Sequence, residues 1–337
     1  MRRRQFLGTL VAGAAYTACG EQPHKMAPRS VPEDPPPGSD PPPPDAARPA
    51  TPPPDARANP PADAGAAPPA DAAPEPTPTP ARKSASDQVV LGKTGIKVSR
   101  LAMGSGTHGS GGTSAQTQLG IPTFSRLLVQ SYHEQGLNFW ETADAYGAHP
   151  HLKEAISQVG RDKVVIVSKS HATTAKAMQA DVERFLTELG TDHLDGVLLH
   201  AVTSGTWTQQ MAGAMEYLEM AKQKGQVRAH GISCHSLAAL RLAARTPWVD
   251  LDFARINPAQ IQMDSDPATV ISVLREMKAA GKGIVGMKIL GVGELANQMD
   301  TAIKHAVGLD CIDAMTIGFT SFAQLTQVTG KIQAVQG

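Results

Sequence analysis

The chain has 337 residues, of which 31 are basic and 31 acidic, so its formal net charge is zero. This balance argues against a nucleic-acid-binding surface, which usually carries a clear excess of Lys and Arg. The three cysteines, Cys19, Cys234 and Cys311, offer neither a disulfide framework nor a CxxC metal site.

Residues 1–19, MRRRQFLGTLVAGAAYTAC, combine a basic start, a short apolar segment and small residues before a cysteine. This pattern predicts a secretory signal peptide and is too short for a transmembrane helix. Arg3 and Arg4 are similar to a twin-arginine export signal, and the residues before Cys19 are similar to a lipobox, which would make Cys19 a lipidation site. We therefore expect an exported protein, periplasmic or in the cell envelope, anchored in the membrane through Cys19. A basic segment retained on a cytoplasmic protein is the alternative.

Residues 20–85 are rich in Pro, Ala, Asp and Thr and contain 22 of the 27 prolines. Large apolar side chains are almost absent, so we expect a disordered linker. Proline-rich chains sample polyproline II at ~3.1 Å per residue, and such a linker could reach on the order of 150–200 Å. A spacer that crosses the cell wall and a merely tolerated disordered segment both fit this composition.

The remaining residues, 88–337, alternate short apolar runs with longer amphipathic segments, which is typical of parallel strands joined by helices. Their number suits a single (β/α)8 TIM barrel, an α/β fold. We expect the eight strands at 100–104, 138–142, 164–168, 196–199, 229–233, 253–257, 284–288 and 314–318. Helical spacing is clearest over 124–135, 151–159, 176–189, 211–224 and 268–280, and the glycines that follow predict helix ends.

One stretch carries the most specific motif. In NFWETADAYG, residues 138–147, an apolar run ends in an acid and a tyrosine follows five residues later. This stretch resembles the FxDTAxxYG signature of the aldo-keto reductases. Three further motifs of that family follow in order: Lys169 in VIVSKS, His200 in GVLLHAV and Ser233 in HGISCHS. The resemblance covers residues 88–337 and implies a hairpin over residues 88–98 that closes the bottom of the barrel.

The resemblance also implies catalytic roles, all at the C-terminal ends of strands, where barrels place their active sites. Tyr146 would be the general acid, and Lys169 would lower its pKa from ~10 by favouring the phenolate. Glu141 would hold Lys169, while His200 would orient the substrate carbonyl. The family has aspartate where this chain has Glu141. Because one extra methylene moves a carboxylate by ~1 Å, we expect weakened or redirected activity.

For the cofactor, NADP or NAD, the resemblance implies that Ser233 binds the nicotinamide carboxamide. Cys234 stands where the family usually has asparagine, and Asn257 where it usually has glutamine. Met287 replaces the aromatic residue that stacks on the nicotinamide.

The phosphate end of the cofactor site depends on two other segments. Gly291 and Lys288 would let the backbone and a positive charge approach the pyrophosphate. Thr320 and Ser321 keep the hydroxyl donors of the last loop, but the arginine expected near Gln324 is missing. We therefore expect no strong preference for NADP over NAD.

The predicted function is NAD(P)-dependent reduction of an aldehyde, ketone or sugar-like carbonyl. The expected partners are a nicotinamide nucleotide, a small carbonyl substrate and, through Cys19, the membrane, and no nucleic acid is expected. A catalytically degenerate barrel that acts as a surface binding or scaffold lipoprotein is the alternative. A metal hydrolase is a third possibility, because six histidines lie near the predicted active-site face: His108, His149, His151, His171, His200 and His235. We predict no metal site, because the HPH segment, His149-Pro150-His151, is expected in a loop and lacks the spacing of known zinc motifs, and because Lys169 would repel a cation.

Overall fold

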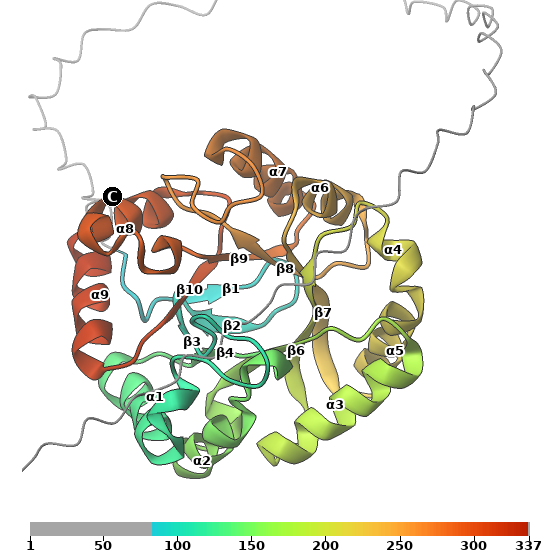
Figure 1. The fold of residues 1–337 in the computed structure, drawn as a ribbon, viewed down its shortest axis with the longest axis horizontal. Helices are drawn as coiled ribbons and strands as arrows, with labels where there is room; N and C mark the ends of the chain where they lie inside the picture. Colours follow the sequence, from blue (N-terminus) through green and yellow to red (C-terminus); the bar gives the residue numbers. More distant parts are fainter. Residues whose placement is uncertain (1–82, 336–337) are drawn as a thin grey trace, which may run out of the picture. The chain divides into compact units, whose positions relative to one another are not determined.

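The structure, a computed structural model, describes residues 83–335; the predicted signal peptide and nearly all of the predicted linker lie outside these residues. Eight parallel strands form a closed barrel, and helices surround it (Figure 1). The predicted (β/α)8 barrel is therefore confirmed.

The barrel strands neighbour one another in the order β10-β3-β4-β5-β6-β7-β8-β9. Their bounds are β3 Leu101–Gly104, β4 Phe139–Glu141, β5 Val165–Ser170, β6 Leu194–Val202, β7 Val227–Cys234, β8 Leu251–Arg255, β9 Gly283–Met287 and β10 Ala314–Gly318. Each of them overlaps a predicted strand.

The α-helices are α1 Ile121–Gln135, α2 His149–Val159, α3 Ala175–Leu189, α4 Trp207–Gln210, α5 Ala212–Gln223, α6 Leu237–Arg245, α7 Pro267–Ala279, α8 Met299–Gly308 and α9 Phe322–Ala334. Short 3-10 helices are η1 Thr117–Leu119, η2 Asp144–Tyr146, η3 Arg161–Lys163, η4 Gly291–Gly293 and η5 Ala296–Gln298. As expected, α1 and α3 end at left-handed glycines, Gly136 and Gly190. One detail differs: the HPH segment expected in a loop is the first turn of α2, where proline's fixed φ suits the helix start.

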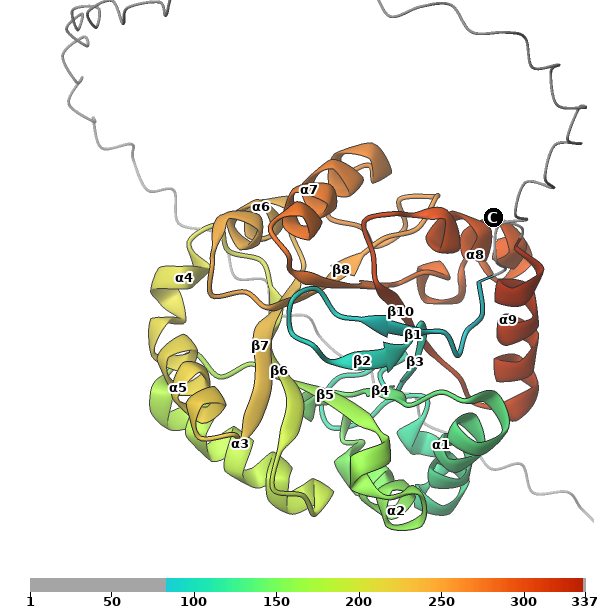
Figure 2. The ribbon, with the colours of Figure 1, turned by 180° about the vertical axis from the view of Figure 1, so that it is seen from behind.

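An antiparallel hairpin of β1 (Gln88–Val90) and β2 (Lys97–Ser99) lies across one end of the barrel, as Figure 2 shows. Its apolar side chains Leu91, Ile96 and Val98 are fully or almost fully buried and join the cluster that fills the barrel interior. The hairpin therefore closes the end opposite the C-terminal ends of the strands, as the resemblance implied.

Strand alternation divides the apolar residues into two layers. In β5, Val165 and Val167 belong to the barrel interior, whereas Ile166 belongs to the larger cluster between the strands and the helices. The same alternation sends Lys169 inward, into the upper part of the barrel, and this placement begins the candidate active site.

The described chain begins just before the hairpin. Ala85 is buried and its carbonyl accepts a hydrogen bond of 3.0 Å from Leu101, while Asp87 forms an ion pair with Arg100 at 3.2 Å. Residues 83–87 thus pack against the barrel. Between residues 83 and 335, no helix combines the length and hydrophobicity that crossing a membrane requires.

Candidate active site

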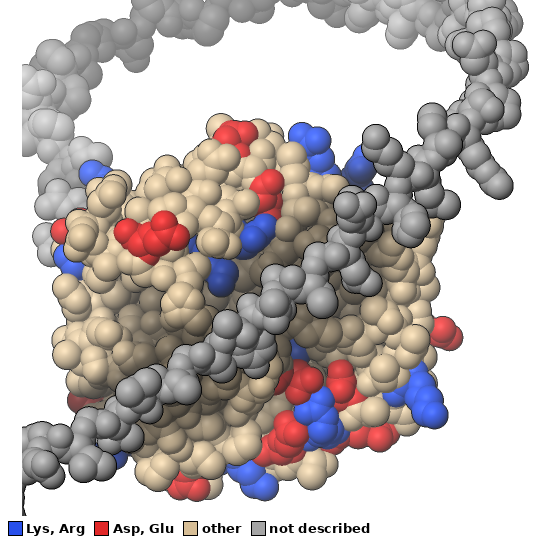
Figure 3. Space-filling model, in the orientation of Figure 1, with Lys and Arg blue, Asp and Glu red and all other residues tan. Residues whose placement is uncertain are grey.

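The candidate site lies at the end of the barrel opposite the hairpin. A cavity of about 120 Å³ opens there among the ends of β3, β4, β9 and β10, and its lining includes Glu141, Tyr146, Met287, Lys288 and Thr316. Figure 3 shows this side of the barrel, with groups of acidic and basic side chains toward its margins. A small polar molecule could enter from this side.

Lys169 and Glu141 form a buried ion pair at the bottom of the cavity. Lys169 Nζ contacts Glu141 Oε1 and donates a second hydrogen bond, 2.9 Å long, to the Thr142 carbonyl. Thr316 Oγ1 donates to the other carboxylate oxygen of Glu141 at 3.1 Å. Gly104 completes the arrangement, since a Cβ there would lie only 3.2 Å from Glu141 Oε2. Thr316 and Gly104 thus accommodate the longer glutamate side chain.

Tyr146 lies above this pair, at the end of the 3-10 turn η2. Its hydroxyl is 3.3 Å from His200 Nε2, and the two rings meet edge to face. Two glycines of the loop after β3 seat the phenol ring: a Cβ on Gly106 or Gly109 would approach it to within 2.2 or 2.3 Å. A glycine-rich loop after the first barrel strand is visible in the sequence. The family motifs, however, did not indicate that these glycines contact Tyr146.

The expected effect of Lys169 on Tyr146 is not found. Burial raises the pKa of Tyr146 to about 12. Lys169 Nζ lies over the ring face, 5.0 Å from its centroid, and donates its hydrogen bonds to Glu141 and Thr142 instead of the phenol oxygen. The expectation of a lowered phenol pKa is therefore wrong for this structure. A protonated phenol is nevertheless the form that donates a proton to a carbonyl oxygen.

His200 is held neutral. Burial lowers its pKa to about 2, and the nearby charges of Lys169, His171, His235 and Lys288 act in the same direction. His171 stacks on the His200 ring at 4.5 Å between centroids. A neutral imidazole with its proton on Nε2 can donate a hydrogen bond to a carbonyl oxygen but cannot serve as the acid.

Helix α3 supports the turn that carries Tyr146. The Arg184 guanidinium donates to Asp144 at 2.7 Å, to Asp181 at 2.9 Å and to Glu188 at 3.1 Å. Asp144, the first residue of η2, is thereby joined to α3. The spacing of Asp181, Arg184 and Glu188 on one helix face was visible in the sequence, but their contact with Tyr146's turn was not.

The same helix also holds the end of β5, on both sides of Lys169. Ser170 Oγ donates to Asp181 at 2.5 Å. His149 bridges Ser168 at 2.8 Å and Glu188 at 2.6 Å, and burial lowers the pKa of His149. This Ser-His-Glu series resembles a hydrolytic triad in order, but Ser168 is fully buried between strand and helix, so its role is structural.

Ser233 and Cys234 face opposite sides of β7. Ser233 is buried, and its hydroxyl makes no hydrogen bond with the described residues, so it is available to a ligand. Cys234 belongs to the apolar cluster that faces the helices, where burial and Asp252 raise the pKa of its thiol. The structure therefore does not bring Cys234 to the cavity.

Asn257 is fully buried and committed to its own loop. Its amide nitrogen donates to the carbonyls of Ile261 and Lys288 at 2.7 and 3.1 Å, and its oxygen accepts from the backbone of Ala259 and Ile261 at 3.1 Å each. These contacts use both N–H donors and both oxygen lone pairs of the side-chain amide, so no group of this side chain is left for a ligand. Asn257 thus anchors Lys288, whose left-handed backbone (φ 60°) turns the chain at the cavity wall.

The two segments predicted to bind the cofactor phosphates, around Gly291 and around Thr320, differ in whether their hydrogen-bond donors are already used within the protein. Gly291 adopts φ 54° in a turn beside the cavity, and a Cβ there would press on Ile261 at 3.1 Å. Ser321 caps α9, while Gln324 accepts hydrogen bonds from both the backbone and the hydroxyl of Thr320 at 2.9 and 3.1 Å. The side chain that stands at the expected arginine position therefore already occupies these donors. Among residues 83–335, no three His, Cys, Asp or Glu side chains gather into a metal-binding group.

Comparison with known proteins agrees with this geometry. The sequence profile of the Aldo/keto reductase family matches residues 100–310. L-galactose dehydrogenase of Arabidopsis thaliana is 24% identical over 226 residues, 62% of this chain and 66% of that protein. Norsolorinic acid reductase of Emericella nidulans is 29% identical over 178 residues, 47% of this chain and 45% of that protein. The chain thus spans less than two thirds of the length of either relative.

Solved structures show the same fold. A putative aldo-keto reductase from Pseudomonas aeruginosa superimposes with a TM-score of 0.64 at 22% identity, covering 76% of this chain and 99% of that one. An aldo-keto reductase from Bacillus halodurans in its holo form gives a TM-score of 0.61 at 16% identity, covering 74% and 91%. With the profile match over most of the barrel, this places the chain in the aldo/keto reductase family of oxidoreductases.

Proposed function

We propose that the protein reduces an aldehyde, ketone or sugar-like carbonyl with NADPH or NADH, with Tyr146 as the general acid. The observation that carries this proposal is the 3.3 Å contact between Tyr146 Oη and His200 Nε2 above the buried Lys169–Glu141 pair. Two neutral donors there converge on one point, where a carbonyl oxygen would receive both hydrogen bonds.

The residues present fit a nicotinamide better than they fit its phosphates. The unpartnered hydroxyl of Ser233 suits the carboxamide, and Met287 offers an apolar surface at the cavity wall. Lys288 would place a positive charge near the pyrophosphate, although burial and Arg255 lower its pKa. The bound nucleotide would supply the hydride.

The chain's own groups would manage the proton. Because the Tyr146 pKa is about 12, the phenol is protonated throughout the neutral range and can donate as the oxygen gains charge. His200, neutral over the same range, would hold the carbonyl oxygen toward the phenol. Lys169 would stabilise the resulting phenolate across the ring face.

A catalytically degenerate barrel is the second candidate, and the capped Thr320–Gln324 loop favours it. Both proposals can be separated with the purified full chain. We expect NADPH or NADH to quench protein fluorescence at sub-millimolar concentration and to be oxidised in the presence of carbonyl compounds. Absence of binding of both nucleotides at millimolar concentration would exclude the reductase and favour the degenerate barrel.

Tyr146→Phe isolates the chemical step. The ring keeps its seat against Gly106 and Gly109, so nucleotide affinity should be retained while kcat falls by ~10²–10⁴, the range for loss of a general acid. Lys169→Met should cost a similar factor, and the double variant should be little worse than either, because groups acting as one unit are non-additive. Unchanged turnover in Tyr146→Phe would exclude this mechanism.

We also propose that the protein is exported and anchored through Cys19, which the sequence of residues 1–19 supports. Nicotinamide nucleotides are cytoplasmic, so such a protein would need a tightly held nucleotide or a redox partner. Replacing Arg3 and Arg4 by Lys should retain the precursor in the cytoplasm, and Cys19→Ser should release a soluble exported form. A wild-type protein that fractionates as cytoplasmic and unprocessed would contradict this.

A further inference from the structure

Three imidazoles lie at the C-terminal ends of three strands that are neighbours in the barrel. His171 follows β5, His200 is near the end of β6 and His235 follows β7. Three histidines elsewhere in the structure contact a carboxylate: His149, His193 and His230. Between residues 83 and 335, no such contact involves the three imidazoles at the strand ends. Their N–H groups are therefore not committed to an acid in this part of the chain.

His171 is the exposed member of this group and lies beside the proposed proton donor. Its ring stacks on the ring of His200, with 4.5 Å between the centroids and 28° between the planes. His200 Nε2 in turn is 3.3 Å from Tyr146 Oη. The carbonyl oxygen of a substrate would bind where Tyr146 and His200 meet. His171 therefore lies next to the groups that are attached to the carbonyl carbon.

The backbone around His171 is fixed. Ser170 is fully buried at the end of β5, and its Oγ accepts a hydrogen bond of 2.9 Å from the amide of Ala172. The same oxygen donates to Asp181 on α3 at 2.5 Å. This turn and the stack on His200 together hold the imidazole in place. A side chain that is already ordered loses little conformational entropy when it binds a ligand.

The charge near the three imidazoles is positive. Two of the cations there are balanced by ion pairs: Lys169 with Glu141, and Arg255 with Asp264. Lys288 lines the same cavity as Tyr146 and makes no ion pair with the described residues. Burial lowers the pKa of His235 to about 4, and nearby basic groups act in the same direction: Arg255, Lys288, Lys169 and His171. An anionic group on a substrate would be attracted to this region.

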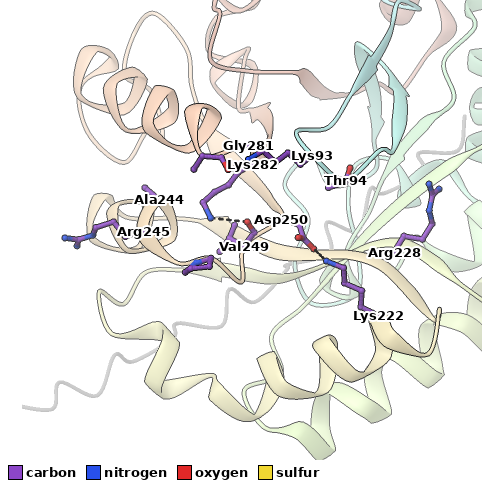
Figure 4. Close-up of a pocket in the computed structure, with 12 residues that line it drawn as sticks. Lys93, Thr94, Lys222, Arg228, Ala244, Arg245, Val249, Asp250, Gly281 and Lys282 are labelled. Atoms are coloured by element: carbon purple, nitrogen blue, oxygen red, sulfur yellow. Dashed lines mark hydrogen bonds and ion pairs between the residues drawn. The ribbon is translucent and has the colours of Figure 1, made fainter.

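The larger cavity at the hairpin end of the barrel, about 520 Å³, has its central cations already paired (Figure 4). Lys222 pairs with Asp250 at 2.5 Å. The Lys282 ammonium donates to the carbonyls of Thr246 and Val249 at 2.6 and 3.1 Å. These groups are used within the protein, so recognition of an anion is better supported beside Tyr146.

We propose that the substrate is an α-keto acid, a carbonyl compound with a carboxylate on the carbonyl carbon, and that His171 binds this carboxylate. Because the two imidazoles stack at 4.5 Å, hydrogen bonds from His171 and His200 can end on neighbouring groups of one small molecule. The carbonyl carbon receives the hydride that the nucleotide supplies, and its oxygen receives the Tyr146 proton. The products are an α-hydroxy acid and the oxidised nucleotide. This inference rests on the proposed function and adds the substrate class.

The first test is calorimetric titration of the full chain with oxamate and with oxamide, in saturating NADPH and again without nucleotide. Oxamate has the shape of an α-keto acid but cannot be reduced, and oxamide replaces its carboxylate by a neutral amide of similar size. Oxamate should bind about tenfold more tightly than oxamide or better. Added salt should reduce the difference, because it screens the charge. Equal binding of the two compounds would overturn the proposal.

His171→Phe tests where the carboxylate binds. Phenylalanine keeps a ring that can stack on His200 but has no N–H group, so the preference for oxamate over oxamide should fall by about tenfold. The same substitution at His133, an exposed histidine on α1, is the matched control and should leave the preference unchanged. If His171→Phe weakens the binding of both compounds equally, His171 only supports the ring of His200, and the proposal is wrong.

Turnover separates this inference from the proposed function. Pyruvate and diacetyl have similar shapes, but only pyruvate carries a carboxylate. His171→Phe should lower the ratio of kcat/KM for pyruvate to that for diacetyl by about tenfold, chiefly through the KM for pyruvate. Reduction of diacetyl without any preference for oxamate would overturn the substrate class and leave the proposed function standing. Preferential binding of oxamate without reduction of either compound would contradict the proposed function, and the substrate class with it, and leave only a carboxylate site.

Discussion

The Arg184 guanidinium donates a 2.7 Å hydrogen bond to Asp144, and this contact joins helix α3 to the turn that carries Tyr146. Both side chains are partly exposed, so an isolated pair of this kind would contribute only ~0–1 kcal/mol. Arg184 also binds Asp181 and Glu188, which in turn hold Ser170 and His149. The network thus fixes Tyr146 and the strand of Lys169 relative to one helix.

The first prediction concerns this positioning role. Arg184→Gln should leave the fold intact and lower kcat by ~3–10-fold, because a small displacement of the acid weakens proton transfer. The KM for the nucleotide should not change, since Arg184 lies outside the cavity. Steady-state kinetics with melting temperatures would check this. Arg126→Gln, an exposed arginine on α1, is the control. A parallel loss in both variants would remove the positioning role.

The second prediction concerns Glu141, whose length the sequence comparison treated as a defect. In the structure, Lys169 contacts one carboxylate oxygen of Glu141 and Thr316 donates a hydrogen bond to the other. Gly104 leaves room for this carboxylate because it has no Cβ. An aspartate is about one methylene shorter and cannot reach both partners. Glu141→Asp should therefore lower kcat by ~10–100-fold.

Thr316→Val tests the same arrangement from the other side. It removes the hydroxyl at nearly constant volume, and we expect a smaller loss of kcat, about threefold to tenfold. If Glu141→Asp instead matches or exceeds wild-type turnover, the glutamate is a misplaced version of the family's aspartate.

The third prediction concerns the nucleotide. Gln324 occupies the donors of Thr320, and no arginine follows to bind a 2′-phosphate, so NADPH and NADH affinities should differ by less than about tenfold, or ~1.4 kcal/mol. Titration with both nucleotides measures this directly. A much stronger NADPH preference would mean that another cation, such as Lys288, has taken over the 2′-phosphate, and Lys288→Gln should then abolish it.

The barrel could be predicted from the sequence because its signals are local. An apolar run such as residues 164–168 predicts a strand in that same segment, and a glycine such as Gly136 predicts the end of the helix before it. The apolar hairpin residues Leu91 and Ile96 likewise lie close in sequence to the first barrel strand. The grouping of Tyr146, Lys169 and His200 was likewise implied by motifs at successive strand ends.

Side-chain direction and pairing were not predictable in the same way. Ser233 and Cys234 are neighbours in the motif, yet strand alternation sends one inward and the other toward the helices. The Asn257 side chain could bind a ligand, but its hydrogen bonds are made to the backbone of its own loop. The Tyr146 pKa depends on burial and on the direction of Lys169 Nζ, which only the packed structure defines.

The last prediction concerns Asp252, a fully buried acid on β8 beside Cys234. Burial raises the pKa of this carboxyl group from 3.8 to about 7; the neighbouring Cys234 thiol acts in the opposite direction, and Asp264 adds to the rise. A raised folded-state pKa means that the folded protein holds a proton that the unfolded chain has already lost. The free energy of unfolding should therefore be highest below pH ~4 as far as this group is concerned, and should fall as the pH rises toward 7.

The size of that effect is on the order of a few kcal/mol, enough to measure by urea unfolding at pH 5 and pH 8. Asp252→Asn keeps the shape but cannot ionise, so it should remove this part of the pH dependence and make the protein more stable than wild type at pH 8. Glu294→Gln, an exposed acid near the other end of the barrel, should leave the pH dependence unchanged. If Asp252→Asn destabilises the protein equally at both pH values, the carboxylate is ionised and stabilised in the fold, and the assigned pKa direction is wrong.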